Sequence, residues 1–147
     1  MTQQLDLPNA RTVAEGVISA GQPSPEQLKK AAAAGVKTIV NLCGEGECSW
    51  NEADLVKSLG MHYVNIPVCG APDVNMESAR RLHAVVDDAA NYPMVIHCGS
   101  GNRVGALFAL KAFEREGCDL EKAIEKGRLA GLTMLEPHVR QCLSRAM

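Results

Sequence analysis

Short apolar runs alternate along the chain with longer stretches in which apolar residues recur at helical spacing. The apolar runs are rich in Val, Ile and Leu, a composition that favours buried β-strands. They predict strands at 17–19, 36–42, 61–68 and 94–96. Strands alternating with helices at these lengths indicate a parallel sheet with right-handed crossovers. We therefore expect an α/β fold in three layers, with a mostly parallel central sheet of about four to five strands flanked by helices.

Residues that suit helix ends mark the limits of the intervening helices. Ser24 can cap a helix that has Pro25 in its first position, and Gly35 ends it after a run of alanines. Further helices are predicted at 52–59, 76–90, 104–113 and 120–129, with a last one opening at Pro137. No repeat, linker or low-complexity segment interrupts the pattern, so residues 1–147 are predicted to form a single catalytic domain.

The segment H-C-G-S-G-N-R-V-G, residues 97–105, lies where the strand at 94–96 ends and the next helix begins. In an open α/β sheet, ligands bind at the carboxyl ends of the strands. Gly99 and Gly101 allow a tight turn that aims successive N–H groups into one concavity, which attracts anions. A thiolate at Cys98 is stabilised there, and the planar fork of Arg103 can hold two oxygens of a tetrahedral oxyanion. These residues predict a nucleophilic cysteine with a small oxyanion substrate.

This segment resembles the active-site loops of two thiolate enzyme families, the cysteine-dependent phosphatases and the rhodanese sulfurtransferases. Four residues separate Cys98 from Arg103, as in the rhodanese loop, whereas the phosphatase pattern has five. The shorter loop loses about 3.5 Å of chain and one potential N–H donor. Both families usually place Ser or Thr after the Arg, but Val104 stands here and cannot hydrogen-bond the thiolate.

The segments I-S-A-G-Q-P-S at 18–24, G-V-K-T-I-V-N-L at 35–42 and A-I-E-K-G-R-L-A-G-L at 123–132 carry a wider resemblance. They are similar to small bacterial phosphatase-like domains of the DUF442 type, which are related to dual-specificity phosphatases and occur beside β-lactamase-like hydrolases. The resemblance implies a cysteine-phosphatase-like fold with a loop of rhodanese length. It also implies that the chain is either a phosphatase or a sulfurtransferase.

The two enzyme hypotheses differ in their need for a general acid. A sulfurtransferase needs none, because sulfite leaves thiosulfate as a weakly basic anion; a Cys98 persulfide would then pass its sulfur to a thiol or to cyanide. We rank this hypothesis first. The alternative is a protein tyrosine or dual-specificity-type phosphatase with a Cys98 phosphoenzyme, in which Asp73 protonates the leaving alkoxide. Asp73 also suits a turn or cap position. A further alternative is a non-catalytic oxyanion-binding module.

The other loop residues are assigned supporting roles. Substrate-binding positions are predicted at Gly99, Ser100, Gly101, Asn102 and Val104. Ser100 can instead be a small filler, and Asn102 can cap the following helix. His97 is expected to support the loop by bonding its backbone. No residue stands at metal-ligand spacing, so neither a metal nor a cofactor is predicted.

Composition limits the remaining possibilities. With 46% hydrophobic but only 3% aromatic residues, the core must be aliphatic, and a net charge of −2 without basic clusters argues against nucleic acid or an anionic membrane as partner. The N-terminal ten residues have neither a basic start nor an apolar core, so we expect a cytoplasmic protein with reduced cysteines. Among these, Cys43 and Cys48 can approach Cys98 as acceptor or resolving thiols. A zinc site that adds Cys69 has no recognisable spacing.

Overall fold

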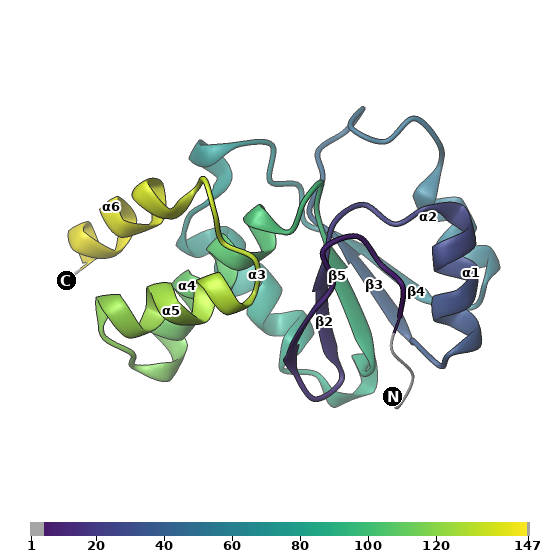
Figure 1. Ribbon diagram of the computed structural model, residues 1–147, viewed down its shortest axis with the longest axis horizontal. Helices are drawn as coiled ribbons and strands as arrows, with labels where there is room; N and C mark the ends of the chain where they lie inside the picture. Colours follow the sequence, from purple (N-terminus) through teal and green to yellow (C-terminus); the bar gives the residue numbers. More distant parts are fainter. Residues whose placement is uncertain (1–4, 147) are drawn as a thin grey trace.

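A five-stranded sheet forms the centre of the molecule in the computed structural model, which describes residues 5–146 (Figure 1). The strand order is β1-β2-β5-β3-β4. The strands are β1 (Arg11–Ala14), β2 (Val17–Ala20), β3 (Thr38–Asn41), β4 (His62–Asn65) and β5 (Met94–His97). The last four run parallel, and β1 pairs with β2 as an antiparallel hairpin at the edge of the sheet. The prediction of a mostly parallel sheet is confirmed.

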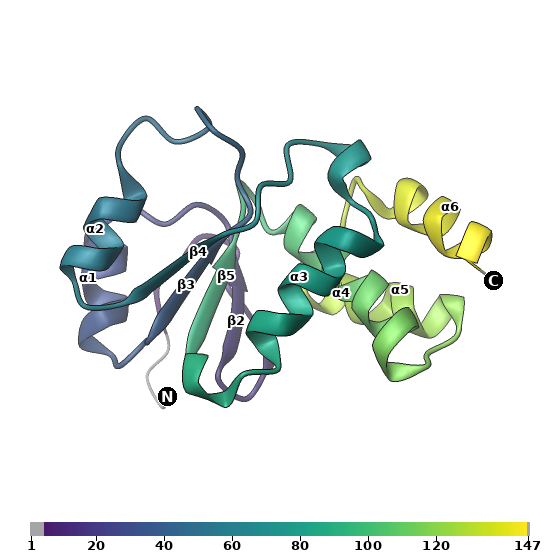
Figure 2. The same cartoon turned by 180° about the vertical axis from the view of Figure 1, so that it is seen from behind.

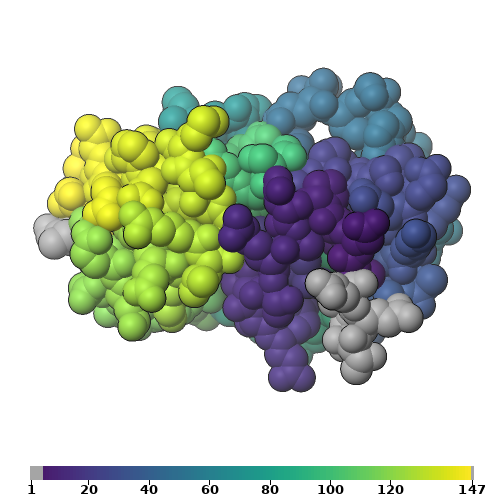
Figure 3. Space-filling view, viewed as in Figure 1, coloured from purple at the N-terminus to yellow at the C-terminus, as the bar shows by residue number. Residues whose placement is uncertain are grey.

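Helices cover both faces of this sheet, which makes the three layers expected from the sequence (Figures 1 and 2). One face carries α1 (Pro25–Ala33) and α2 (Glu52–Ser58). The other four helices lie on the opposite side: α3 (Met76–Val86), α4 (Asn102–Glu116), α5 (Leu120–Leu129) and α6 (Glu136–Ala146). Two short 3₁₀ turns, η1 (Ala71–Asp73) and η2 (Ala89–Asn91), flank α3. The space-filling view shows the C-terminal helices at one end of the molecule, beside the N-terminal part of the sheet (Figure 3).

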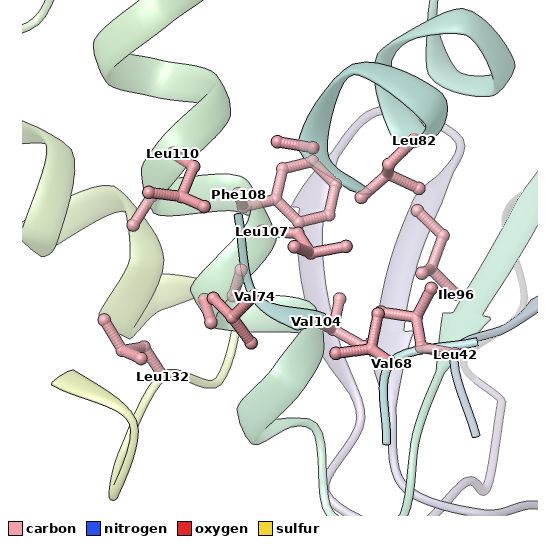
Figure 4. Close-up of a cluster of buried hydrophobic side chains, with 14 of the residues drawn as sticks. Leu42, Val68, Val74, Leu82, Ile96, Val104, Leu107, Phe108, Leu110 and Leu132 are labelled. Atoms are coloured by element: carbon pink, nitrogen blue, oxygen red, sulfur yellow. The ribbon is translucent and has the colours of Figure 1, made fainter. Parts of the chain in front are cut away.

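Each face of the sheet has its own aliphatic core. The larger cluster packs between the sheet and helices α3–α6 and includes Leu42, Leu82, Ile96, Leu107 and Leu110 (Figure 4). The smaller one packs under α1 and α2. Strand β5 contributes to both because side chains alternate along a strand: Ile96 belongs to the larger cluster and Val95 to the smaller. This alternation decides where the next two side chains, His97 and Cys98, point.

The predicted elements differ from the observed ones at a few boundaries. The capping box at Ser24 is present, and α5 spans the predicted residues. Helix α3 ends at Val86 rather than Ala90, because Asp88 caps a separate 3₁₀ turn. Strand β1 was not predicted, since Arg11–Ala14 is largely exposed and lacks an apolar run.

Residues 1–4, part of the N-terminal stretch discussed above, lie outside the described residues. Within residues 5–146, no helix combines the length and the apolar composition that crossing a bilayer requires.

Candidate active site

The Cys98 loop joins the central strand β5 to helix α4 at the carboxyl edge of the sheet (Figure 1). Gly101 has φ +99°, a left-handed conformation that glycine adopts without strain, and it is the N-cap of α4. The loop therefore turns directly into the helix, with Arg103 in the first helical turn. A loop of only four residues between Cys98 and Arg103 is accommodated in this way.

The backbone of the loop directs an N–H group at the Cys98 thiol. The Gly101 N–H donates to Cys98 Sγ at 3.1 Å, and Cys98 is completely buried. The two carbonyls that flank this amide accept hydrogen bonds from other parts of the chain. The Ser100 carbonyl accepts one from the Asn9 side-chain amide, and the Gly101 carbonyl accepts one from the Gly105 N–H. The predicted nest of amides beside Cys98 thus has one donor already directed at the sulfur.

Arg103 is fixed by two neighbours that the sequence analysis did not single out. Its Nη1 and Nη2 donate to the two carboxylate oxygens of Glu47, both at 2.8 Å, and Nη1 also donates to the Val68 carbonyl at 2.8 Å. The Glu47 carboxylate raises the pKa of Arg103 above its already high ordinary value, and the same hydrogen bonds lower that of Glu47. A Cβ at Gly99 would lie 3.3 Å from Nη2, so the guanidinium passes directly beside the loop.

The contacts of Arg103 leave one side of its fork available. Among the described residues, Nε and the second hydrogen of Nη2 have no hydrogen-bond partner. These two N–H groups are parallel, which is the geometry that binds two oxygens of a phosphate or sulfate. Glu47 therefore fixes the orientation of Arg103 while leaving the Nε and Nη2 side of its fork unpaired.

A buried pair lies beneath the loop on the other face of the sheet. Because His97 follows Ile96 on β5, it points towards α2, where its Nε2 lies 2.5 Å from Glu52 Oε2. Its Nδ1 faces the Cys98 carbonyl at 3.3 Å. The second Glu52 oxygen accepts the Gln22 side chain at 2.8 Å. His97 and Glu52 are 0% and 3% exposed, so the loop support predicted for His97 depends on a carboxylate that the sequence analysis did not identify.

Both ring nitrogens of His97 face oxygen atoms, Nε2 that of Glu52 and Nδ1 that of the Cys98 backbone. The pair therefore joins the base of the loop to α2.

Asp73 lies on η1, in the loop that also supplies the Val68 carbonyl to Arg103. Its Oδ2 accepts the Cys69 N–H at 2.9 Å, which is the local turn role considered from the sequence. The side chain is half-buried, and no hydrogen bond to Oδ1 is present among the described residues. One carboxylate oxygen of Asp73 is thus held by the loop, and the other has no hydrogen-bond partner among the described residues.

Two residues predicted to bind substrate are occupied in other ways. The Asn102 side-chain oxygen accepts the N–H groups of Thr133 and Leu135, at 2.9 and 3.2 Å, and so ties the loop to the α5–α6 connection rather than capping α4. The Val104 side chain is fully buried in the larger core cluster (Figure 4) and faces away from the open side of the loop.

The remaining cysteines of the site differ in environment. Cys43 is buried, and burial, reinforced by the nearby Glu47 carboxylate, raises the pKa of its thiol to about 12. The thiol of Cys69 lies against Gly44, where a Cβ would come within 2.4 Å of the sulfur. Cys43 and Cys48 border a cavity of about 360 Å³ that also includes Trp50 and Tyr63. Within residues 5–146, no group of three or more His, Cys, Asp or Glu side chains is arranged to hold a metal ion.

Comparison with known families decides to which group this cysteine loop belongs. Residues 6–135 match the family model PTP-NADK, described as "DSP-PTPase phosphatase fused to NAD+ Kinase". The chain belongs to the PTP-NADK family. The expected likeness to dual-specificity-type phosphatase domains is confirmed, and the matched region contains every residue of the candidate site.

Individual relatives agree with this assignment. The PTP-NADK chain is 32% identical over 104 residues, 67% of its length, to inositol diphosphatase DSP4 of Arabidopsis thaliana, and it spans 52% of that protein. A putative phosphatase of Neisseria meningitidis shares its fold with a TM-score of 0.72 at 22% identity, covering 93% of this chain and 97% of the other. The catalytic core of the Saccharomyces cerevisiae PP-IP phosphatase Siw14 gives a TM-score of 0.68 at 18% identity, with coverage of 95% and 88%.

These comparisons bear on the ranking of the two enzyme hypotheses. They support a cysteine-dependent phosphatase, which was the alternative. The sulfurtransferase ranked first from the loop length gains no support from them.

Proposed function

We propose that this PTP-NADK chain is a cysteine-dependent phosphatase that hydrolyses phosphate esters through a Cys98 phosphoenzyme. The observation that carries the proposal is the pairing of a loop amide with the nucleophile: the Gly101 N–H donates to Cys98 Sγ at 3.1 Å, within a chain matched over residues 6–135 by a phosphatase family. An N–H donor directed at the sulfur stabilises the thiolate, which is the nucleophilic form of cysteine.

In the first step, Cys98 Sγ attacks phosphorus and the bond from phosphorus to the ester oxygen breaks. The charge on the phosphoryl oxygens is met by the loop N–H groups and by the free Nε and Nη2 hydrogens of Arg103. In the second step, water attacks the phosphocysteine, which releases inorganic phosphate and restores the thiolate. Glu47 takes no part in bond making; it holds Arg103 in place for both steps.

Asp73 is the proposed general acid of the first step. Its Oδ2 is held by the Cys69 N–H, so the carboxyl group has a defined position on the loop that also contacts Arg103. Protonation matters most when the leaving group is a poor one, such as an alkoxide, and least when it is a stable phenolate. This difference separates an acid catalyst from a residue that only shapes the turn.

The experiment measures hydrolysis of para-nitrophenyl phosphate and of an alkyl phosphate by the wild type, Cys98→Ser and Asp73→Asn. We expect Cys98→Ser to lose at least about 10³-fold in kcat on both substrates. Asp73→Asn should lose about 10²-fold on the alkyl ester and much less on the aryl ester. Rapid quenching of the wild type should trap one phosphoryl group on Cys98, detected by mass spectrometry.

A sulfur adduct on Cys98 is the result that would favour the sulfurtransferase hypothesis. The count of four residues between Cys98 and Arg103 is the one feature that favours sulfur transfer. Incubation with thiosulfate that adds one sulfur atom to Cys98, together with no turnover of any phosphate ester, would overturn the proposal in favour of a sulfurtransferase.

A further inference from the structure

The Cys98 loop is surrounded by segments from five other parts of the chain, all at the carboxyl edge of the sheet. Direct contacts identify them: Gly99 O accepts the Gln22 N–H, and Ser100 O accepts the Asn9 side chain. Arg103 and Asn102 supply the contacts to the others. The surrounding segments are 5–10, 21–24, 42–51, 66–75 and 130–135. Any group attached to a phosphate over Cys98 must lie among them.

Positive charge is almost absent from these segments. Counting the Cys98 loop with them, Arg103 is the one Lys or Arg within these ranges, and one exposed cation, Arg11, follows directly on 5–10, where it pairs with Ser19 of β2. The same segments carry four carboxylates: Asp6, Glu45, Glu47 and Asp73. The positive charge of Arg103 is itself paired with Glu47. The site therefore has cationic and N–H donors for one phosphoryl group, and the segments around it carry a net negative charge.

The neighbouring surfaces repeat this imbalance. The 360 Å³ cavity next to the loop includes Glu45 and Glu52 and is lined by no Lys or Arg. Four helices begin at this edge, and three of them have acidic residues in their first turns: Glu26 in α1, Glu52 and Asp54 in α2, and Glu77 in α3. The fourth, α4, has none and carries Arg103 there. The cation at the end of α5, Arg128, donates to both oxygens of Glu136.

Substrates differ in how they respond to such a surface. A phosphate monoester with an uncharged leaving group brings about two negative charges, which the loop amides and Arg103 can meet. Each further phosphate adds a similar charge that would face more carboxylates than cations, and like charges brought together repel. The charge distribution thus selects against polyphosphorylated molecules.

We infer that the substrate is a phosphate monoester whose leaving group carries no further phosphate and is neutral or cationic. The inference rests on the proposed function and narrows it. It sets this chain apart from relatives whose names specify an inositol diphosphate or a PP-IP substrate.

The test separates the substrate class from the activity itself. Turnover of para-nitrophenyl phosphate establishes the phosphatase, and its absence rejects the proposed function. Binding of anions to intact Cys98→Ser is measured by calorimetry at 0.15 M salt, with phenyl phosphate and inositol hexakisphosphate as probes. We expect phenyl phosphate to bind at least tenfold more tightly. Equal or tighter binding of inositol hexakisphosphate would overturn the inference, even where the aryl phosphate is hydrolysed.

A pair of charge reversals gives a matched control in the same background. Glu45 is exposed on the loop beside the site, and Glu15 is exposed in the β1–β2 turn at the opposite edge of the sheet. Glu45→Lys should strengthen binding of inositol hexakisphosphate several-fold, with a gain that shrinks at higher salt, whereas Glu15→Lys should not. An equal gain from both variants would contradict an effect local to the site.

Discussion

Two carboxylate pairs hold the Cys98 loop from opposite sides, and they differ most in their exposure to water. Beneath the loop, Glu52 and His97 are 3% and 0% exposed; above it, the side chains of Glu47 and Arg103 are 35% and 16% exposed. Removing one partner of a buried pair destabilises the fold, because the other partner is left buried without its hydrogen bond. A half-exposed pair contributes little to stability but can still fix an orientation. The first pair should therefore matter for folding and the second for catalysis.

The largest expected effect is on the buried side. Glu52→Ala removes the partner of His97 Nε2 and of the Gln22 amide, and should lower the free energy of unfolding by about 3–5 kcal/mol. Denaturant unfolding followed by circular dichroism measures it. Glu52→Gln, which can still hydrogen-bond a neutral His97, should lose clearly less. A change below about 1 kcal/mol in the alanine variant would show that the pair is not structural.

In the more exposed pair, Glu47→Gln should lower the rate of catalysis rather than the stability of the fold. Loss of the bidentate contact lets Arg103 move, and a displacement of about 1 Å at a substrate-positioning group can lower kcat/KM about 10²-fold. The unfolding free energy should stay within about 1 kcal/mol. The control is Glu114→Gln, because Glu114 makes the same two-oxygen contact with Arg80 on the remote surface. Equal losses of activity in the two variants would contradict a specific role of Glu47 in positioning Arg103.

The pH dependence sharpens the same comparison. The pKa of Glu47 is lowered by the Arg103 hydrogen bonds, so its ionised form, and with it the pair, persists below the ordinary glutamate value of about 4.3. The ratio of kcat/KM between the wild type and Glu47→Gln should be constant from pH 7 down to that value. It should fall towards one only at lower pH. A ratio that already declines between pH 7 and 5 would mean that Glu47 is not ionised as the structure implies.

The smallest effect is expected at Cys43, whose thiol is close to both pairs. Because burial and the Glu47 carboxylate raise its pKa to about 12, only about one thiol in 10⁴ is ionised at pH 8. Iodoacetamide at pH 8 should leave Cys43 unlabelled in peptide mass spectra. Cys43→Ala should keep kcat/KM within about threefold. Rapid labelling of Cys43 would instead support the acceptor or resolving role considered from the sequence.

Local signals in the sequence were sufficient for the scaffold and for the nucleophile. Ser24 caps α1 through bonds within four residues, and the glycines around Cys98 mark the loop by themselves. Contacts over long separations could not be found in this way. Glu47 and Glu52 lie 56 and 45 residues from their partners. The available signal was weak: acidic residues after β3, at the edge where Cys98 also lies.

Asn102 and strand β1 are further cases in which contacts with distant residues, rather than local sequence, determine the structure. Asn102 has a side chain suited to a helix cap, but its oxygen accepts N–H groups from Thr133 and Leu135, which no local pattern reveals. The extended segment at Arg11–Ala14 was missed because its pairing with β2, rather than its composition, makes it a strand.

The bond from Asn102 to Thr133 also has a consequence for the order of events during synthesis. When a growing chain has left the ribosome as far as α4, all five strands and the nucleophile are already available to fold. The backbone that anchors Asn102, and the Ala130 carbonyl that accepts the Ser19 hydroxyl at 2.6 Å, are still inside the exit tunnel. We therefore expect the sheet to assemble before Cys98 gains its final surroundings, so that the nascent protein acquires reactivity last.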